Sequence, residues 1–124
     1  MAMKNPYQTY QTNAVATSSP QELTLMLYNG CIKFIRLSSI AMEKGDMEAK
    51  NTNIIKAQNI LYELRSSLNM EMDLSQTMDA LYEYMISQLV TANIQNDASI
   101  LKEVEGLAEE FRNTWKQAME QAKK

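Results

Sequence analysis

The sequence predicts an all-α fold, an antiparallel up-down-up-down four-helix bundle preceded by a partly mobile N-terminal arm. After residue 18, apolar residues recur at steps of three and four, which is the period of an α-helix with one buried face. Three short breaks divide this part of the chain into four segments, and no segment alternates like a strand. Because short loops make successive helices antiparallel, the four apolar stripes should meet in one bundle.

The first 18 residues differ in composition from the rest of the chain. Asn, Gln, Thr and Ser dominate there, and the sizeable apolar side chains are few: Tyr7, Tyr10 and Val15. Such a segment has little apolar surface to bury, so we expect an arm over residues 1–18 and a bundle over 19–121.

The first helix is expected over about residues 20–44 and has the strongest start signal. Ser19 can act as the N-cap, Pro20 suits the first helical position, and Glu22 can complete a capping box. The stripe that should face the core contains Leu23, Leu27, Gly30, Phe34, Leu37 and Ala41. Further apolar residues cover most of the remaining circumference: Leu25, Met26, Tyr28, Cys31, Ile32, Ile35, Ile40 and Met42. We expect this surplus to be covered by something besides one neighbouring helix.

The other helices are expected over about residues 47–68, 74–95 and 98–121. Gly45 can close the first helix in a left-handed conformation, and Asp46 can cap the second. The breaks around 69–73 and 96–97 also contain Asn and Asp, which can end one helix or cap the next. The predicted stripes are Ile54, Ala57, Leu61, Leu64 and Leu68; then Leu74, Met78, Leu81, Met85, Leu89 and Ala92; then Leu101, Val104, Ala108, Phe111, Trp115 and Ala118.

Charge and composition argue against several classes of partner. The 124 residues carry a formal net charge of -3, with a pI near 5.0, and no basic run exceeds the Lys123-Lys124 pair. We therefore expect no nucleic-acid partner. The single cysteine cannot form an internal disulfide, the start lacks a secretory signal, and no apolar run approaches the roughly 18 residues of a membrane span. A soluble, cytoplasmic protein without membrane insertion is expected.

The residues needed for most catalytic sites are missing from this sequence. It has no histidine, which removes nucleophile–histidine pairs, most zinc sites and the ligands of di-iron bundles. Cys31 lies among apolar residues, where burial would leave its thiol inert, and three glycines cannot form a phosphate-binding loop. We expect no enzyme, cofactor or metal.

With catalysis and nucleic-acid binding disfavoured, we expect the protein to function by binding another protein. Ten residues are methionine, several of them clustered as Met70, Met72, Met78 and Met85, and this flexible side chain suits irregular apolar partners as well as loosely filled cores. Tyr82 and Tyr84 flank a core position, and we expect one of them to seal the bundle and the other to serve an interface.

Six short motifs stand out along the chain: Ser19-Pro20-Gln21-Glu22-Leu23, Met26-Leu27-Tyr28-Asn29-Gly30, Lys56-Ala57-Gln58, Leu81-Tyr82-x-Tyr84-Met85, Ala92-Asn93-x-x-Asn96-Asp97 and Phe111-Arg112-x-x-Trp115. In their order and spacing they resemble the family of the flagellar secretion chaperone FliS. The resemblance runs from Tyr7 to about Trp115 and is greatest to members from Bacillus-like bacteria.

The resemblance implies a cytosolic export chaperone. Such a protein binds the disordered C-terminal segment of flagellin, prevents its premature polymerisation and delivers it to the flagellar type III export gate. It implies flagellin contacts on the second and third helices, for which we nominate Ile54, Gln58, Leu61, Leu89, Asn93 and Asn96. Ile54, Leu61 and Leu89 also fall on the bundle stripes, so a purely structural role is open for them.

The resemblance also implies a role for the arm, in which Tyr7 and Tyr10 would cover apolar surface or contact the export gate. A second function stays open at this stage. The same surface could serve a regulatory adaptor that binds another flagellar assembly protein.

Overall fold

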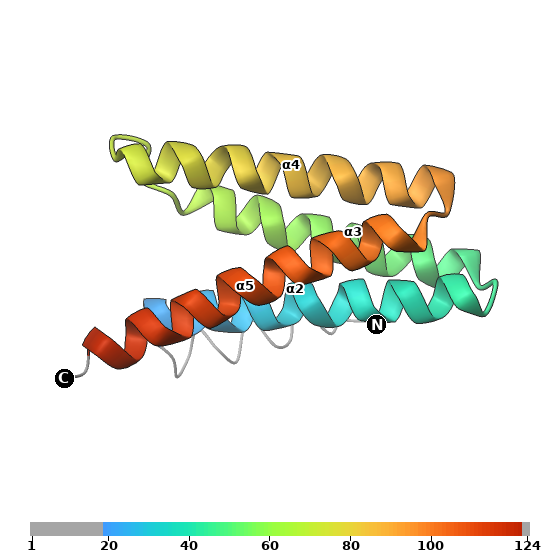
Figure 1. Cartoon of the computed structure of the whole chain (residues 1–124), viewed down its shortest axis with the longest axis horizontal. Coiled ribbons are helices and arrows are strands. Elements are labelled where there is room, and N and C mark those ends of the chain that lie inside the picture. Colours follow the sequence, from blue (N-terminus) through green and yellow to red (C-terminus); the bar gives the residue numbers. More distant parts are fainter. Residues whose placement is uncertain (1–18, 123–124) are drawn as a thin grey trace, which may run out of the picture.

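The computed structural model describes residues 19–122, which form four helices joined by short connections (Figure 1). They are α2 (Pro20–Glu43), α3 (Met47–Ser66), α4 (Asp73–Gln95) and α5 (Ala98–Ala122). The predicted all-α four-helix fold is confirmed. The helix ends lie within two residues of the expected positions, and the predicted arm lies outside the described residues.

The helix ends follow from local chemistry. At the start of α2, the Ser19 hydroxyl accepts a hydrogen bond from the Glu22 N–H at 3.2 Å, and the Glu22 carboxylate accepts one from the Ser19 N–H at 3.2 Å. Gly45 has φ 75° in the turn to α3, where Asp46 accepts from the Ala49 N–H at 3.1 Å. Asn96 ends α4 with φ 52°, a conformation that asparagine tolerates.

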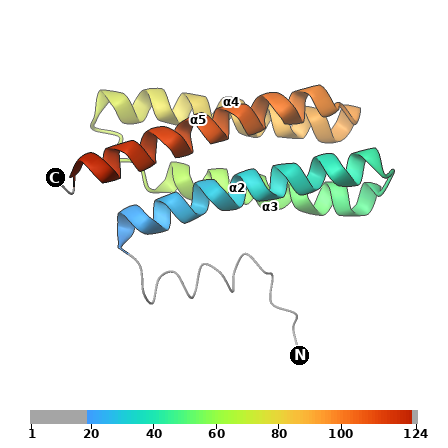
Figure 2. The same cartoon turned by 60° about the horizontal axis from the view of Figure 1, so that its bottom comes forward.

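Each helix packs against two others. α2 contacts α3 and α5, and α4 contacts the same two helices, so the four form a ring around the core (Figures 1 and 2). Ion pairs between Arg36 and both Glu105 and Glu109 join α2 to α5, and Arg65 pairs with Asp79 to join α3 to α4. The up-down-up-down arrangement explains these neighbours.

The surplus apolar surface of α2 is largely covered by the fold itself. Because α2 packs against two helices, residues outside its predicted stripe are buried: Tyr28, Cys31, Ile32 and Ile35. Leu37, on the predicted stripe, is 38% exposed. For the four buried side chains, the cover that the sequence predicts beyond one neighbouring helix is therefore the second neighbouring helix.

The core is complete at one end of the bundle and open at the other. Side chains from all four helices are fully buried together, among them Ile35, Ile54, Leu89 and Leu101. Toward the start of α4 and the end of α5, however, these two helices diverge (Figure 1). The candidate functional site lies at this open end.

Candidate functional site

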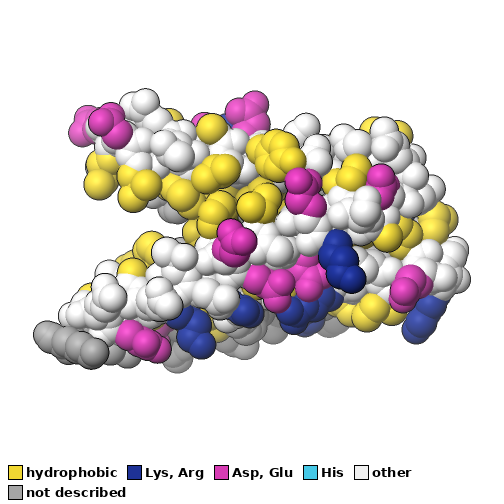
Figure 3. Space-filling view, in the orientation of Figure 1, with side chains coloured by type: hydrophobic (Ala, Val, Ile, Leu, Met, Phe, Trp, Pro, Cys, Tyr) yellow, Lys and Arg dark blue, Asp and Glu magenta, His cyan; other side chains and the backbone are white. Residues whose placement is uncertain are grey.

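An apolar groove lies between the first half of α4 and the second half of α5. Figure 3 shows a hollow there, with apolar side chains on both sides. On the same stripe of α4, Leu74 is 67% exposed whereas Leu89 is 0% exposed. We call this the open groove. From helical spacing and burial we assign to it these exposed or half-buried apolar side chains of α4 and α5: Leu74, Met78, Leu81, Leu107, Phe111 and Ala118. The helices leave this part of their stripes uncovered.

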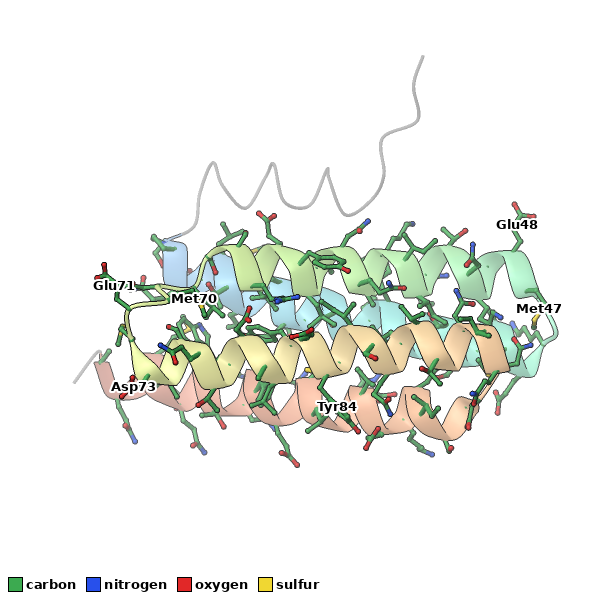
Figure 4. All side chains as sticks on the ribbon, turned by 90° about the horizontal axis from the view of Figure 1, so that it is seen from above. Met47, Glu48, Met70, Glu71, Asp73 and Tyr84 are labelled. Atoms are coloured by element: carbon green, nitrogen blue, oxygen red, sulfur yellow. The ribbon has the colours of Figure 1, made fainter. Side chains whose placement is uncertain are left out.

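Two methionines stand at the mouth of the open groove. Met70 and Met72 lie in the connection between α3 and α4, and both are exposed. Figure 4 places Met70 beside Glu71 and Asp73 at this end of the molecule. Because methionine is unbranched and polarizable, the mouth can adapt to an irregular apolar partner.

The inner end of the groove rests on three aromatic rings. Phe111 of α5 meets Tyr28 of α2 and Tyr82 of α4 edge-on, with ring centroids 6.5 and 6.1 Å apart. The two tyrosine hydroxyls are hydrogen-bonded to each other. Burial is the main cause that raises the pKa of both tyrosines, so both stay neutral at physiological pH. Tyr82 therefore seals the bundle, as expected for one of the two flanking tyrosines.

The second half of α5 follows α2 instead of α4. The Trp115 indole N–H donates a hydrogen bond to the Gln21 carbonyl oxygen at 3.0 Å, and the Arg112 guanidinium donates one to the Asn29 side chain at 3.4 Å. These contacts hold α5 on the α2 side of the bundle. The groove thus opens beyond Phe111 because α5 has its polar partners on α2.

A second apolar surface lies on the outer side of α3 and α4. The Asn93 amide donates to the Asn51 side chain at 2.7 Å, and Arg65 donates to Asp79 at 2.8 Å, so the positions between these pairs border the same inter-helix gap. Ile55, Tyr62 and Val90 are exposed there, and the exposed Ile94 follows Asn93 directly. We call these four residues the α3–α4 strip.

Three of the predicted flagellin contacts belong to the core. The side chains of Ile54, Leu61 and Leu89 are fully buried, which agrees with the structural role that their positions on the predicted apolar stripes left open. They line no surface in this structure. Their chain neighbours Ile55, Tyr62 and Val90 point outward instead, because one residue turns a helix by about 100°.

The predicted amide contacts lie at the surface near the strip. Gln58 and Asn93 are half-buried and Asn96 is exposed. The buried Lys50 ammonium donates to the Asn93 carbonyl oxygen at 2.9 Å and to the Asn96 side chain, and this contact ties the end of α4 to α3. Asn93 and Asn96 therefore have a clear structural role. Tyr7 and Tyr10 lie outside the described residues.

Cys31 is buried in the core of the bundle. Burial raises the pKa of the Cys31 thiol to about 12, which keeps it neutral. Within residues 19–122, no three His, Cys, Asp or Glu side chains come together in a way that could hold a metal ion. In the same range, none of the four helices combines the length and apolar character that a bilayer crossing requires.

Sequence reasoning placed the lining of the open groove in the core. Leu74, Met78 and Phe111 continue the apolar stripes, and spacing alone cannot show that α4 and α5 diverge. The signal that could have revealed the groove was the methionine cluster, since Met70, Met72 and Met78 all lie in or beside it.

Comparison with known proteins identifies the class of protein. The family model described as "Flagellar protein FliS" matches residues 3–122. A relative from Bacillus subtilis (strain 168), the "Flagellar secretion chaperone FliS", is 56% identical over 124 residues, covering 100% of this chain and 93% of the relative. The Escherichia coli (strain K12) protein of the same name is 36% identical over 110 residues, covering 86% of this chain and 81% of the relative.

The chain therefore belongs to the FliS family of flagellar secretion chaperones, as the sequence motifs predicted. A solved structure described as "Crystal structure of flagellar chaperone from bacteria" shares the fold, with a TM-score of 0.77 at 21% identity and coverage of 93% of this chain and 95% of that one. The family role is that of a chaperone, which is not an enzymatic role.

Proposed function

We propose that this protein is a cytoplasmic chaperone that binds the C-terminal segment of flagellin, keeps it from polymerising prematurely and delivers it to the flagellar type III export gate. Two facts support the proposal. The chain belongs to a family of flagellar secretion chaperones. Its open groove also presents an apolar surface that the bundle leaves uncovered, and the groove is the single observation that carries the proposal.

The dimensions of the groove suit a helical segment of the client. From Leu107 to Ala118 the α5 wall rises about 16 Å, which equals roughly three helical turns. An amphipathic helix lying there would supply the apolar neighbour that α4 and α5 lack. Ordering a disordered segment costs about 2–5 kcal/mol of the contact energy, so release at the export gate stays feasible.

The α3–α4 strip is the proposed second contact of the same client. Ile55, Tyr62 and Val90 supply apolar area, and the half-buried Gln58 lies between them as a hydrogen-bonding group. The amides Asn93 and Asn96 border this surface while they hold the end of α4. Ile54, Leu61 and Leu89 would act from beneath by supporting the helices that carry the strip.

The arm keeps the role that the family resemblance implies. In the proposal, Tyr7 and Tyr10 cover apolar surface in the free chaperone or contact the export gate in the loaded one. A chain that lacks residues 1–18 should then lose its preference for delivering the loaded state, and unchanged flagellin binding and delivery would contradict this role.

The proposal is tested by calorimetric titration of the full-length protein with a peptide that spans the C-terminal segment of flagellin. We expect a one-to-one complex and a strongly negative heat-capacity change, because apolar surface is buried as the peptide folds. If the peptide fails to bind while circular dichroism shows an intact bundle, the flagellin proposal is wrong and the adaptor function gains weight.

Two matched variants locate the binding site. Leu74→Glu places a charge in the open groove, and Ile94→Glu places one on the α3–α4 strip; both native side chains are exposed, so both variants should fold. We expect the first to weaken binding by at least about tenfold and the second to weaken it less. The reverse order would make the strip the main site.

A further inference from the structure

The open groove is bordered by a stretch of chain that contains no basic residue. From residue 66 to residue 101 there is no Lys or Arg, whereas five carboxylates occur: Glu71, Asp73, Asp79, Glu83 and Asp97. Asp79 is neutralised by Arg65. Among the residues that the structure describes, no ion pair engages Glu71 or Asp73, which lie at the end of the molecule where α4 begins (Figure 4).

The opposite wall of the groove is acidic as well. Glu103 accepts hydrogen bonds from Tyr84 at 3.0 Å and from Gln88 at 3.1 Å, which places its carboxylate on the α4 side of α5. Glu110 lies seven residues further along, two helical turns away on the same side. Both walls therefore carry negative charge around an apolar centre.

The basic residues of α5 lie on the other side of that helix. Arg112 reaches Asn29 of α2, and helical spacing places Lys102 and Lys116 away from the side that carries Glu103 and Glu110. Figure 3 shows an acidic side chain at the inner end of the hollow and basic side chains below it, where acidic side chains also lie. The basic residues of α5 are thus directed away from the groove.

We propose that the open groove selects an amphipathic helix whose apolar face is flanked on both edges by Lys or Arg. The inference rests on the proposed function and adds the chemistry of the client segment. The apolar face would fill the space between Met78 and Phe111, and the flanking cations would approach Glu71, Asp73 and Glu110. Charges at the rim of an apolar contact govern partner choice and association rate, and salt screens them.

The same charges disfavour a second copy of this chain as the occupant. A copy that presented α4 would bring its own carboxylates against Glu71 and Asp73 without a Lys or Arg from residues 66–101 to neutralise them. Acidic peptides are disfavoured for the same reason. A helix with basic edges meets both the apolar and the electrostatic character of the groove.

The test uses three synthetic helical peptides with one shared Leu and Met face and with Lys, Gln or Glu at the edge positions. Binding to the full-length protein is measured by fluorescence anisotropy at about 50 and about 500 mM salt, where the Debye length falls from about 14 to about 4 Å. We expect the Lys peptide to bind at least about tenfold more tightly than the Glu peptide at low salt, and the ratio to shrink at high salt. Equal affinities for the three peptides would overturn the inference.

A pair of double variants separates a local effect from the net charge of -3. Glu71→Gln/Asp73→Asn removes two charges at the groove, and Glu43→Gln/Glu48→Gln removes two exposed ones elsewhere, Glu48 standing at the opposite end (Figure 4). We expect the preference for the Lys peptide to fall severalfold in the first variant only. An equal fall in both would show a general charge effect and contradict the inference.

The flagellin peptide in the same assay distinguishes the two proposals. If it binds while the three synthetic peptides bind equally, the chaperone function stands and the charge selection is wrong. If the Lys peptide binds selectively while the flagellin peptide does not bind, the groove chemistry is right and the flagellin assignment is wrong.

Discussion

Lys50 is a buried cation that holds two helices together at the closed end. Its ammonium donates to the Asn93 carbonyl oxygen at 2.9 Å and to the Asn96 side chain, next to the end of α4. The carbonyl groups at a helix C-terminus carry partial negative charge, so a cation there is stabilising. The same contact supports Asn96 in its left-handed conformation.

Lys50→Met should therefore destabilise the protein. The substitution keeps most of the side-chain volume but leaves the Asn93 carbonyl and the Asn96 side chain without their donor, which should cost about 1–3 kcal/mol. Urea denaturation followed by circular dichroism measures the loss. Lys102→Met changes an exposed lysine on α5 and should stay within about 0.5 kcal/mol of the parent. Equal effects of the two substitutions would mean that the contact contributes nothing.

Cys31 should make the protein less stable at alkaline pH. Burial raises its pKa from 9.0 to about 12 in the folded state, so above pH 9 the unfolded chain loses this proton while the native protein keeps it. Its contribution to the free energy of unfolding is thus fully present below about pH 9 and is lost as the pH rises toward 12, at up to about 1.4 kcal/mol per pH unit. The raised pKa values of Tyr28 and Tyr82 act in the same direction above about pH 10.

Urea denaturation at pH 7, 9 and 10 tests this effect, with Cys31→Ala as the matched variant. The variant should be less stable at pH 7, since it leaves a small cavity, but its stability should fall less between pH 7 and 10. Parallel pH profiles for parent and variant would contradict the assigned role of the thiol.

At the level of the helices, α5 contains a glycine that serves no visible packing need. A Cβ atom added to Gly106 would meet nothing within 4 Å, and its backbone does not have positive φ. Gly106→Ala should raise the free energy of unfolding by about 0.5–1 kcal/mol, because glycine loses more backbone entropy in a helix. The change in the urea midpoint is the measurement.

Gly45 provides the contrasting case. Its Cβ position is also open, but its φ is 75°, so Gly45→Ala should destabilise the protein by about 1 kcal/mol or more. Opposite signs for the two glycines are expected. If both substitutions stabilised the protein, the left-handed turn between α2 and α3 would not be needed.

The helices themselves were predictable because their signals are local. The Ser19 capping box, the Gly45 turn and the three-to-four spacing each depend on a few neighbouring residues. The side chains that surround each helix could not be predicted, because they depend on the packing of segments that are distant in the sequence. The stripe of α4 is uniform in sequence, yet Leu74 faces a groove and Leu89 faces the core.

The family was predictable from short motifs, whereas the side chains of the candidate groove were not. Family resemblance indicated α3 and α4, where burial separates Leu61 from the exposed Tyr62 by a single residue. Beside the open groove, Trp115 of α5 donates a hydrogen bond to Gln21 of α2, a contact between residues at opposite ends of the bundle sequence. No local pattern encodes such a pairing.

Considered as a whole, the molecule combines a closed half that supplies stability with an open half that presents apolar surface. The closed half contains fully buried side chains from all four helices, among them Ile35, Ile54, Leu89 and Leu101, together with the Lys50 contact. In the open half, Leu74, Met72 and Met70 remain exposed. An exposed apolar surface of this kind contributes little to folding, so a binding role is its physical explanation.

This division predicts that stability and binding respond separately to substitutions on one helix. Leu89→Ala creates a cavity in the closed half and should cost about 2–5 kcal/mol in the free energy of unfolding. Leu74→Ala changes a side chain that is 67% exposed and should cost less than about 0.5 kcal/mol, yet weaken binding of the flagellin peptide severalfold.

Both variants are to be measured by urea denaturation and by peptide titration under conditions where each is folded. Leu89→Ala should retain peptide affinity within about threefold, because its side chain is not accessible to a partner. If Leu89→Ala abolished binding in the folded state while Leu74→Ala had no effect, the client would have to reach the closed half of the bundle. The α3–α4 helix pair would then open on binding, and the groove between α4 and α5 would not be the site.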